Sequence, residues 1–149
     1  MPTHDYVANV QWQGGRSGSG RLELPESGES LPLAVPPEFN GPGGATSPEE
    51  LLTSAVCACY SITLGIVAEN RKLPIESMAV EATGKVEQNG ASFVYKSIVI
   101  RPRIKLGAGA TEAHEEQARD LAMKADHYCI VTNAVRDKVT VTVEPAISR

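Results

Sequence analysis

The stretch from Ser47 to Glu69, SPEELLTSAVCACYSITLGIVAE, constrains the fold of this chain more than any other. Ser47 suits a helix N-cap, Pro48 suits the first helical position, and Glu50 lies three residues after the cap, as in a capping box. No residue from Leu51 to Ala68 is charged, and a helix that is apolar on all sides is buried or spans a membrane. Because hydroxyls, a glycine and small alanines dilute the run, we predict a central helix wrapped by the rest of the chain and no membrane span.

The length and charge of the chain limit the classes of protein to consider. Its 149 residues predict a single domain, residues 1–149, and a hydrophobic fraction of 42% is enough for a core. The net charge of −4 and the pI of about 5.4 give no basic footprint for nucleic acid or anionic lipid. The first ten residues, MPTHDYVANV, lack the basic-then-apolar build of a signal peptide. We therefore expect a cytoplasmic protein.

Alternation of apolar and polar side chains indicates strands on both sides of this helix. The predicted strands are 6–13, 21–24, 31–35, 78–87, 93–106 and 139–143. Asn89-Gly90 is a strong hairpin signal, and Pro102 suggests an edge strand or a bulge. A second helix is expected from a Thr111 cap to about Asp126, followed by a connector. The order of strands, helix, strands, helix and strand predicts an α+β fold with largely antiparallel sheet.

Three cysteines carry the candidate chemistry: Cys57, Cys59 and Cys129. An odd number suits no secreted disulfide framework. Cys57 and Cys59 differ by two helical positions, about 200° of rotation, so they face opposite ways. That opposition argues against a zinc site built from the three cysteines and His127, because the ligands could not surround one tetrahedral ion. Two interpretations stay open: inert buried thiols, or a redox pair of Cys59 and Cys129.

A redox pair has specific chemical requirements. A thiolate attacks the O–O bond of a peroxide and becomes a sulfenic acid, and a second thiol condenses with it to a disulfide. A free cysteine is only a few per cent thiolate at neutral pH. Cys59 lies in the middle of the predicted helix, so the N-terminal dipole helps it little. A cationic partner is needed, and arginine stays charged when it is partly desolvated.

Three segments together resemble one known family. They are GGRSGSG after a Trp-containing strand, TSPEELLTSAVCACYSITL, and CIVTNAV before the final strand. Across essentially the whole chain the sequence resembles the OsmC/Ohr family of osmotically inducible and organic hydroperoxide resistance proteins, and within it the OsmC-like members. The second-cysteine region of the family often reads Cys-Pro, whereas this chain has Cys129-Ile130. The second thiol is kept, and the local turn differs.

The resemblance implies an OsmC-like fold, in which antiparallel sheets wrap around buried central helices in an intertwined homodimer. It also implies a thiol-dependent peroxidase without a prosthetic group. Cys59 would be the peroxidatic thiol and Cys129 the resolving thiol. Arg16 would stabilise the Cys59 thiolate, and Glu49 would orient that arginine.

Other residues compete with this assignment or fall outside it. Arg21 is a rival for the arginine, but Arg16 directly follows the glycine pair of the motif. Cys57 matches no family role, so we expect inert packing. His127 could shuttle a proton, although an exposed loop histidine is the commoner case. Glu50 is expected to serve the helix cap.

The leading functional hypothesis is reduction of an alkyl or fatty-acyl hydroperoxide to its alcohol. A dithiol reductant, by resemblance a protein-bound lipoyl group or another thiol, would regenerate the enzyme. Acyl transfer by Cys59 and His127 is a weaker rival, because no oxyanion-hole motif is readable. From another class, a non-catalytic ligand-binding or stress-response protein could use the same dimer cleft.

Overall fold

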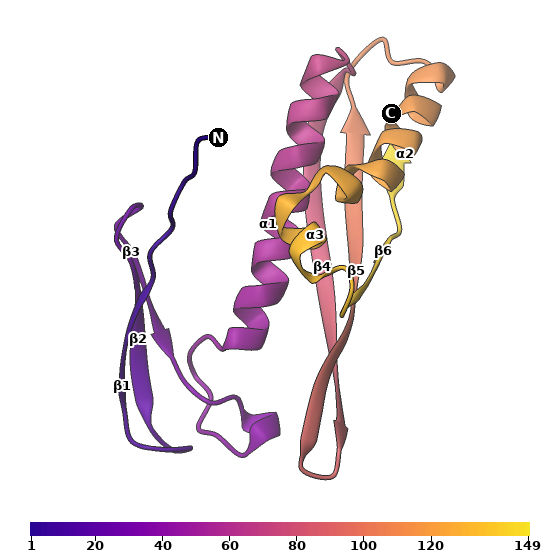
Figure 1. Ribbon diagram of the computed structural model, residues 1–149. Helices are drawn as coiled ribbons and strands as arrows, with labels where there is room; N and C mark the ends of the chain where they lie inside the picture. The colour runs from indigo at the N-terminus through magenta and orange to yellow at the C-terminus, as the bar shows by residue number, and fades with distance from the viewer. The chain divides into compact units, whose positions relative to one another are not determined.

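The computed structural model describes all residues from Met1 to Arg149 and divides into two compact units, 1–51 and 52–149. The first unit contains β1 (Asn9–Gln13), β2 (Ser19–Leu24), β3 (Glu29–Leu33) and the short 3-10 helix η1 (Pro37–Phe39). Helix α1 (Pro48–Asn70) begins in the first unit and continues into the second (Figure 1). The second unit then holds β4 (Ile75–Asn89), β5 (Ser92–Leu106), α2 (Glu112–Lys124), η2 (Ala125–Tyr128), α3 (Ile130–Val135), β6 (Thr140–Val143) and β7 (Ala146–Ser148).

The N-terminal sheet follows the predicted hairpin. Strands β1, β2 and β3 pair antiparallel in that order. Gly20 lies opposite Trp12, and a Cβ there would come within 2.5 Å of the indole, so the position has room only for glycine. The third strand forms at Glu29–Leu33, slightly earlier than predicted. Within the sheet only Leu22 is buried, so this unit has little core of its own.

Helix α1 forms where the sequence predicts it. The Ser47 hydroxyl accepts a hydrogen bond from the Glu50 amide at 3.2 Å, and Thr46 donates its hydroxyl to Glu50 Oε1 at 2.6 Å. The first bond satisfies a backbone N–H of the helix N-terminus that would otherwise need water, and the second holds the Glu50 side chain beside the cap.

The expectation that α1 is buried on all sides is wrong for the single chain. One stripe is buried, formed by Val56, Tyr60, Leu64 and Ala68, whereas Ile62 is 64% exposed and Ile66 is 52% exposed. By length and composition alone, with a mean hydropathy of 1.9, α1 could also cross a membrane. Core helices of soluble proteins pass the same test, so this is weak evidence for a span.

The second sheet is mixed: antiparallel pairing, which the sequence predicts for most of the sheet, is joined by parallel pairing that it does not predict. Strands β4 and β5 form the expected hairpin around Asn89 and Gly90. Strands β6 and β7, however, both pair parallel to β5. Parallel neighbours need a crossover connection, and the segment of α2, η2 and α3 between β5 and β6 provides it.

Pro102 lies in the central strand β5, not at an edge or a bulge as predicted. It pairs with Val80 of β4, and the register shifts of this hairpin lie elsewhere. On the other side of β5, the β6 pairing ends at Ile100 and the β7 pairing begins at Arg103. A proline has no N–H to give to a ladder, and Pro102 lies in the gap between the two parallel partners.

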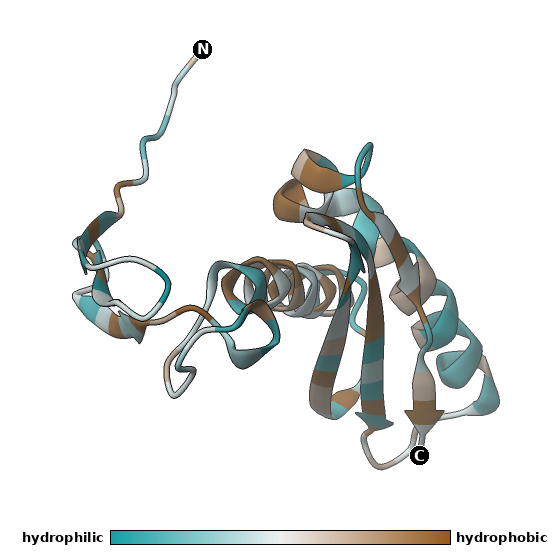
Figure 2. Ribbon diagram, turned by 90° about the horizontal axis from the view of Figure 1, so that it is seen from below, coloured by the Kyte–Doolittle hydropathy of each residue, from teal (hydrophilic) through white to brown (hydrophobic).

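The core of the second unit lies between this sheet and the helices. It combines the buried stripe of α1 with alternate residues of β5 and one face of α2. The residues from β5 and α2 are Ile98, Ile100, Ile104, Leu106, Ala118, Leu121 and Ala122. Because the inward residues of β5 share one face, α1 and α2 cover the same side of the sheet (Figure 1). Figure 2 shows hydrophobic and hydrophilic bands alternating along these strands, as a sheet covered on one face requires.

A close approach fixes α1 against the hairpin. The hydroxyls of Thr53 in α1 and Tyr95 in β5 hydrogen-bond to each other. A Cβ on Gly84 of β4 would come within 1.9 Å of the Tyr95 hydroxyl and 2.6 Å of the Thr53 hydroxyl. Glycine at position 84 therefore leaves the space in which this bond forms.

Candidate functional site

The thiols of Cys59 and Cys129 lie within hydrogen-bonding reach of each other. Cys59 is half-buried in the middle of α1, and Cys129 is fully buried at the junction of η2 and α3. Seventy positions separate them in the sequence, and the packing of α2 and η2 beside α1 brings them together. Both are free thiols, so this is the reduced form of the pair.

The two sulfurs have opposite electrostatic environments. Burial raises the pKa of Cys59, but hydrogen bonds from Cys129, the Val131 backbone, the Thr63 hydroxyl and the Ile130 backbone outweigh it, so the pKa is lowered. Burial raises the pKa of Cys129, and the neighbouring Cys59 raises it further. Cys59 is thus the thiol that ionises first, with the Cys129 S–H as one of its donors.

Apart from Thr63 of α1, the donors to Cys59 come from α3 and its N-cap. The sequence predicts only a connector here, not a helix. Cys129 is the N-cap of α3, with an extended backbone at φ −83° and ψ 116°, and its sulfur accepts the Thr132 N–H at 3.3 Å. The turn after Cys129 therefore presents the amides of Ile130 and Val131 to the Cys59 sulfur. An isoleucine at position 130 retains an N–H that a proline would lack.

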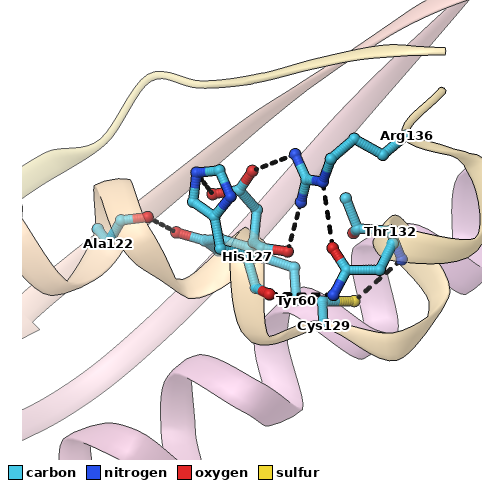
Figure 3. Close-up of polar contacts among 8 residues, drawn as sticks. Tyr60, Ala122, His127, Cys129, Thr132 and Arg136 are labelled. Atoms are coloured by element: carbon cyan, nitrogen blue, oxygen red, sulfur yellow. Dashed lines mark hydrogen bonds and ion pairs between the residues drawn. The ribbon is translucent and has the colours of Figure 1, made fainter.

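An ion pair holds this segment in place (Figure 3). Arg136 Nη1 lies 3.2 Å from Asp126 Oδ2, and Arg136 Nη2 donates to the Asp126 carbonyl oxygen at 2.8 Å. Arg136 Nε also donates to Asn133 Oδ1 at 3.1 Å, and Asn133 Nδ2 donates to the His127 carbonyl oxygen at 3.0 Å. These bonds join the two ends of the turn that carries Cys129.

Asp126 and Arg136 were not among the predicted site residues, although the position of Asp126 in the sequence indicates such a pair. Asp126 lies four residues after Ala122 and therefore continues the buried face of α2. A carboxylate on a buried face needs a charged partner. Arg136 is the next arginine along the chain, and it is that partner.

Tyr60, next to Cys59, fixes α1 against α2. Its hydroxyl is fully buried and donates to the Ala122 carbonyl oxygen at 2.7 Å (Figure 3). Burial, and then the charge of Asp126, raise the pKa of Tyr60, so the hydroxyl stays protonated and remains a donor. The helix carrying the first thiol is thereby bonded to the helix that leads to the second.

Arg16 and Glu49 belong to the N-terminal unit, and each is described within it. Arg16 is exposed in the turn between β1 and β2. Glu49 is half-buried in the first turn of α1. The rival, Arg21, is exposed on β2 opposite Gln11.

Glu49 borders an apolar groove of about 400 Å³. The groove is lined by Val10, Trp12, Leu33, Ala34, Val35, Pro36, Phe39, Pro48 and Glu49. Its walls are almost entirely apolar, and Glu49 is the only ionisable residue that lines it.

Cys57 and His127 do not take part in the hydrogen bonds around Cys59. The Cys57 thiol donates to the Val80 carbonyl oxygen of β4 at 3.5 Å, and burial raises its pKa. His127 is exposed, with Nε2 3.9 Å from Asp126 Oδ1. Neither residue is among the groups that hydrogen-bond Cys59.

Known proteins resemble this chain over nearly its whole length. YmaD of Bacillus subtilis (strain 168), itself an uncharacterized protein, is 31% identical over 99% of this chain and 97% of its own. The organic hydroperoxide resistance protein of Xanthomonas axonopodis pv. citri is 29% identical, with 93% of this chain and 92% of that protein covered. The crystal structure of an organic hydroperoxide resistance protein OsmC from Legionella pneumophila superposes with a TM-score of 0.76 at 26% identity, and it covers 97% of this chain and 99% of that one.

The profile of one protein family matches most of the sequence. Its description is "OsmC-like protein", and the match covers residues 41–144. This span includes α1 with Cys59, strands β4, β5 and β6 of the mixed sheet, and the α2–α3 segment with Cys129. The chain therefore belongs to the OsmC-like protein family.

Proposed function

We propose that this protein is a thiol-dependent peroxidase that reduces organic hydroperoxides to alcohols. The observation that carries the proposal is the pairing of two reduced thiols, one with a lowered pKa and one with a raised pKa. A low-pKa thiol beside a second thiol is the arrangement of a peroxidatic and a resolving cysteine. Relatives named organic hydroperoxide resistance proteins support the substrate class.

The reaction proceeds in two balanced steps. The Cys59 thiolate attacks the distal oxygen of ROOH, the O–O bond breaks, and the alkoxide takes a proton from solvent to leave as the alcohol. Cys59 is then a sulfenic acid. The Cys129 sulfur then loses its proton and attacks the Cys59 sulfur. The hydroxyl group of the sulfenic acid takes up a proton and leaves as water, and a Cys59–Cys129 disulfide remains. A dithiol reductant, for example a protein-bound lipoyl group, returns both thiols by exchange.

Apolar side chains near the thiols support an alkyl or fatty-acyl substrate. Ile62 and Ile66 lie three and seven positions after Cys59, on the same side of α1, and both are exposed. Tyr128 and Ile130 flank Cys129 and are 56% and 82% exposed. Burying such surface against a hydrocarbon chain stabilises binding by about 25 cal/mol per Å², and hydrogen peroxide offers no such contact.

We further propose that the working unit is a homodimer in which Arg16 and Glu49 complete the site. Arg16 would stabilise the Cys59 thiolate, and Glu49 would hold the guanidinium in a bidentate pair. The small core of the N-terminal sheet and the exposed isoleucines of α1 support burial against a second copy.

The decisive experiment adds one equivalent of tert-butyl hydroperoxide to the reduced protein. We expect the loss of two thiols per chain, and peptide mapping should find Cys59 joined to Cys129 with Cys57 free. Cys59→Ser should consume no peroxide, and Cys57→Ser should behave as the parent. No thiol loss in the parent would favour the non-catalytic ligand-binding alternative, and a disulfide containing Cys57 would overturn the pairing.

A further inference from the structure

Thr132 is the buried neighbour of the proposed resolving thiol. It lies three residues after Cys129, in the first turn of α3, and both residues are 0% exposed. The Thr132 N–H donates to Cys129 Sγ at 3.3 Å. Figure 3 shows this bond at the end of the ion-pair network that holds the turn.

The Thr132 hydroxyl is unusual because it is buried and makes no hydrogen bond of normal geometry. Leaving a buried hydroxyl unpaired costs about 1–3 kcal/mol, and valine has the same shape without that cost. The hydroxyl nevertheless lies close enough to the Cys129 sulfur to lower the pKa of this thiol. It is therefore a donor whose acceptor is a neutral thiol, which accepts only weakly.

That acceptor changes during the reaction. Once Cys59 has become a sulfenic acid, Cys129 must lose its proton to attack it, because the thiolate is the nucleophile. Burial opposes this ionisation. An anionic sulfur accepts hydrogen bonds more strongly than a thiol does. The Thr132 hydroxyl therefore donates a strong hydrogen bond only once the Cys129 thiolate has formed.

We propose that Thr132 activates Cys129 as the resolving nucleophile, its backbone N–H and its hydroxyl both donating to the sulfur as negative charge develops there. This inference rests on the proposed function. In the step concerned, Cys129 Sγ loses its proton and bonds to Cys59 Sγ, the S–O bond of the sulfenic acid breaks, and the departing hydroxide takes a proton to leave as water. Thr132 stabilises the negative charge on Cys129 Sγ through its two hydrogen bonds and is itself chemically unchanged.

The test compares Thr132→Val with Thr132→Ser. The valine keeps the branched shape and removes the hydroxyl, and the serine keeps the hydroxyl and removes a methyl group. Stopped-flow mixing with tert-butyl hydroperoxide follows Cys59 oxidation and then disulfide formation, while a dimedone trap reports the sulfenic acid. In Thr132→Val we expect the first phase to stay within about twofold of the parent, and the second to slow about tenfold, equivalent to about 1.4 kcal/mol.

Three further readouts separate activation from packing. The pH profile of the second phase should move to higher pH in Thr132→Val, and Cys59 should over-oxidise at lower peroxide excess because its sulfenic acid lives longer. Thr132→Ser should restore the second phase. The unfolding free energy of Thr132→Val should equal or exceed that of the parent, since the lost hydroxyl had no formed bond. If Thr132→Val does not fold, Thr132→Ala compared with Thr132→Ser makes the same test.

The outcomes distinguish this inference from the function on which it rests. If the parent forms the Cys59–Cys129 disulfide and Thr132→Val forms it equally fast, Thr132 has no activating role and the peroxidase proposal stands. The same holds if Thr132→Ser is as slow as Thr132→Val, because shape and not the hydroxyl then matters. If the parent itself loses no thiols, the proposed function has failed first.

Discussion

Arg136 binds Asp126 through both its carboxylate and its backbone carbonyl oxygen, at 3.2 Å and 2.8 Å. Asp126 precedes Cys129 and Arg136 follows it, so this pair closes the turn that presents the second thiol. The carboxylate of Asp126 is only 6% exposed, whereas the side chain of Arg136 is 31% exposed. The position of Cys129 beside Cys59 thus depends on a contact that neither cysteine makes.

Removal of Arg136 should therefore destabilise the fold. Arg136→Ala leaves the Asp126 carboxylate buried without its cation, and a lost hydrogen bond to a charged group costs about 1.5–3 kcal/mol. Urea unfolding measures this free energy. Arg119→Ala, which removes an exposed arginine of α2, is the matched control and should change it by less than about 0.5 kcal/mol. Equal effects of the two substitutions would show that the pair does not stabilise the turn.

The pH dependence of Cys59 follows from the direction of its pKa shift. Because hydrogen bonds lower the pKa of Cys59, its thiolate persists at lower pH than that of an unperturbed cysteine. The rate of alkylation of Cys59 by iodoacetamide in a Cys57→Ser background, with peptide mapping to count only the Cys59 adduct, should rise with pH through the lowered pKa and then level off. Thr63→Val removes one donor and should move the curve to higher pH.

Ser61→Ala is the control for this experiment, since the Ser61 hydroxyl donates to the Cys57 carbonyl oxygen at 2.7 Å and is not a donor to Cys59. Its curve should coincide with that of the background. A Thr63→Val curve that also coincides would remove Thr63 from the set of donors.

Arg16 should control the reactivity of Cys59 if it supplies the cation that the thiolate needs. Arg16→Ala should raise the Cys59 pKa and slow peroxide reduction while leaving the fold intact. Arg16→Lys should rescue little, because an ammonium lacks the planar fork that engages two partners. Thiolate absorbance against pH is the measurement, and Arg21→Ala is the matched control from the neighbouring strand. If Arg21→Ala raises the Cys59 pKa and Arg16→Ala does not, Arg21 and not Arg16 is the arginine that activates Cys59.

The proposed dimer makes a separate prediction about where Glu49 acts. Helix α1 is continuous from Pro48 to Asn70, and ten residues of α-helix rise about 15 Å. A glutamate side chain cannot span that distance along its own helix to the surroundings of Cys59. We therefore expect Glu49 to serve the thiol of the second copy.

Mixing inactive chains tests this arrangement. Cys59→Ser and Glu49→Ala chains, unfolded and refolded together, should regain part of the parent activity, because one site in the heterodimer combines an intact cysteine with an intact glutamate. Each variant refolded alone should remain inactive. If mass spectrometry confirms heterodimers and the mixture stays as inactive as its parents, the shared site is wrong.

Local signals in the sequence were sufficient for the main elements. The Ser47 cap and the uncharged run after it predicted α1, Asn89-Gly90 predicted the β4–β5 hairpin, and alternation predicted most strands. These features depend on near neighbours in the chain, through capping bonds, turn geometry and the two-residue period of a strand. The helical spacing of Cys57 and Cys59 also predicted that they face opposite ways.

Other features depended on which distant residues meet. The sequence could not place β6 and β7 parallel to β5, or show that Pro102 lies in the gap between their ladders. Nor could it show that Gly84 leaves room for a hydroxyl pair between α1 and β5. Each of these depends on a register, and a register is set by contacts between strands and helices far apart in sequence.

The thiol pair shows the same division. Residue types and family resemblance singled out Cys59 and Cys129. Only the packing of η2 and α3 beside α1 gave them opposite pKa shifts, and only the fold of α3 placed the Thr132 N–H 3.3 Å from the second sulfur. A pKa is set by burial and by hydrogen-bond donors within a few ångströms. Apart from Thr63, those donors come from the far end of the chain, so only the tertiary structure could determine which thiol ionises first.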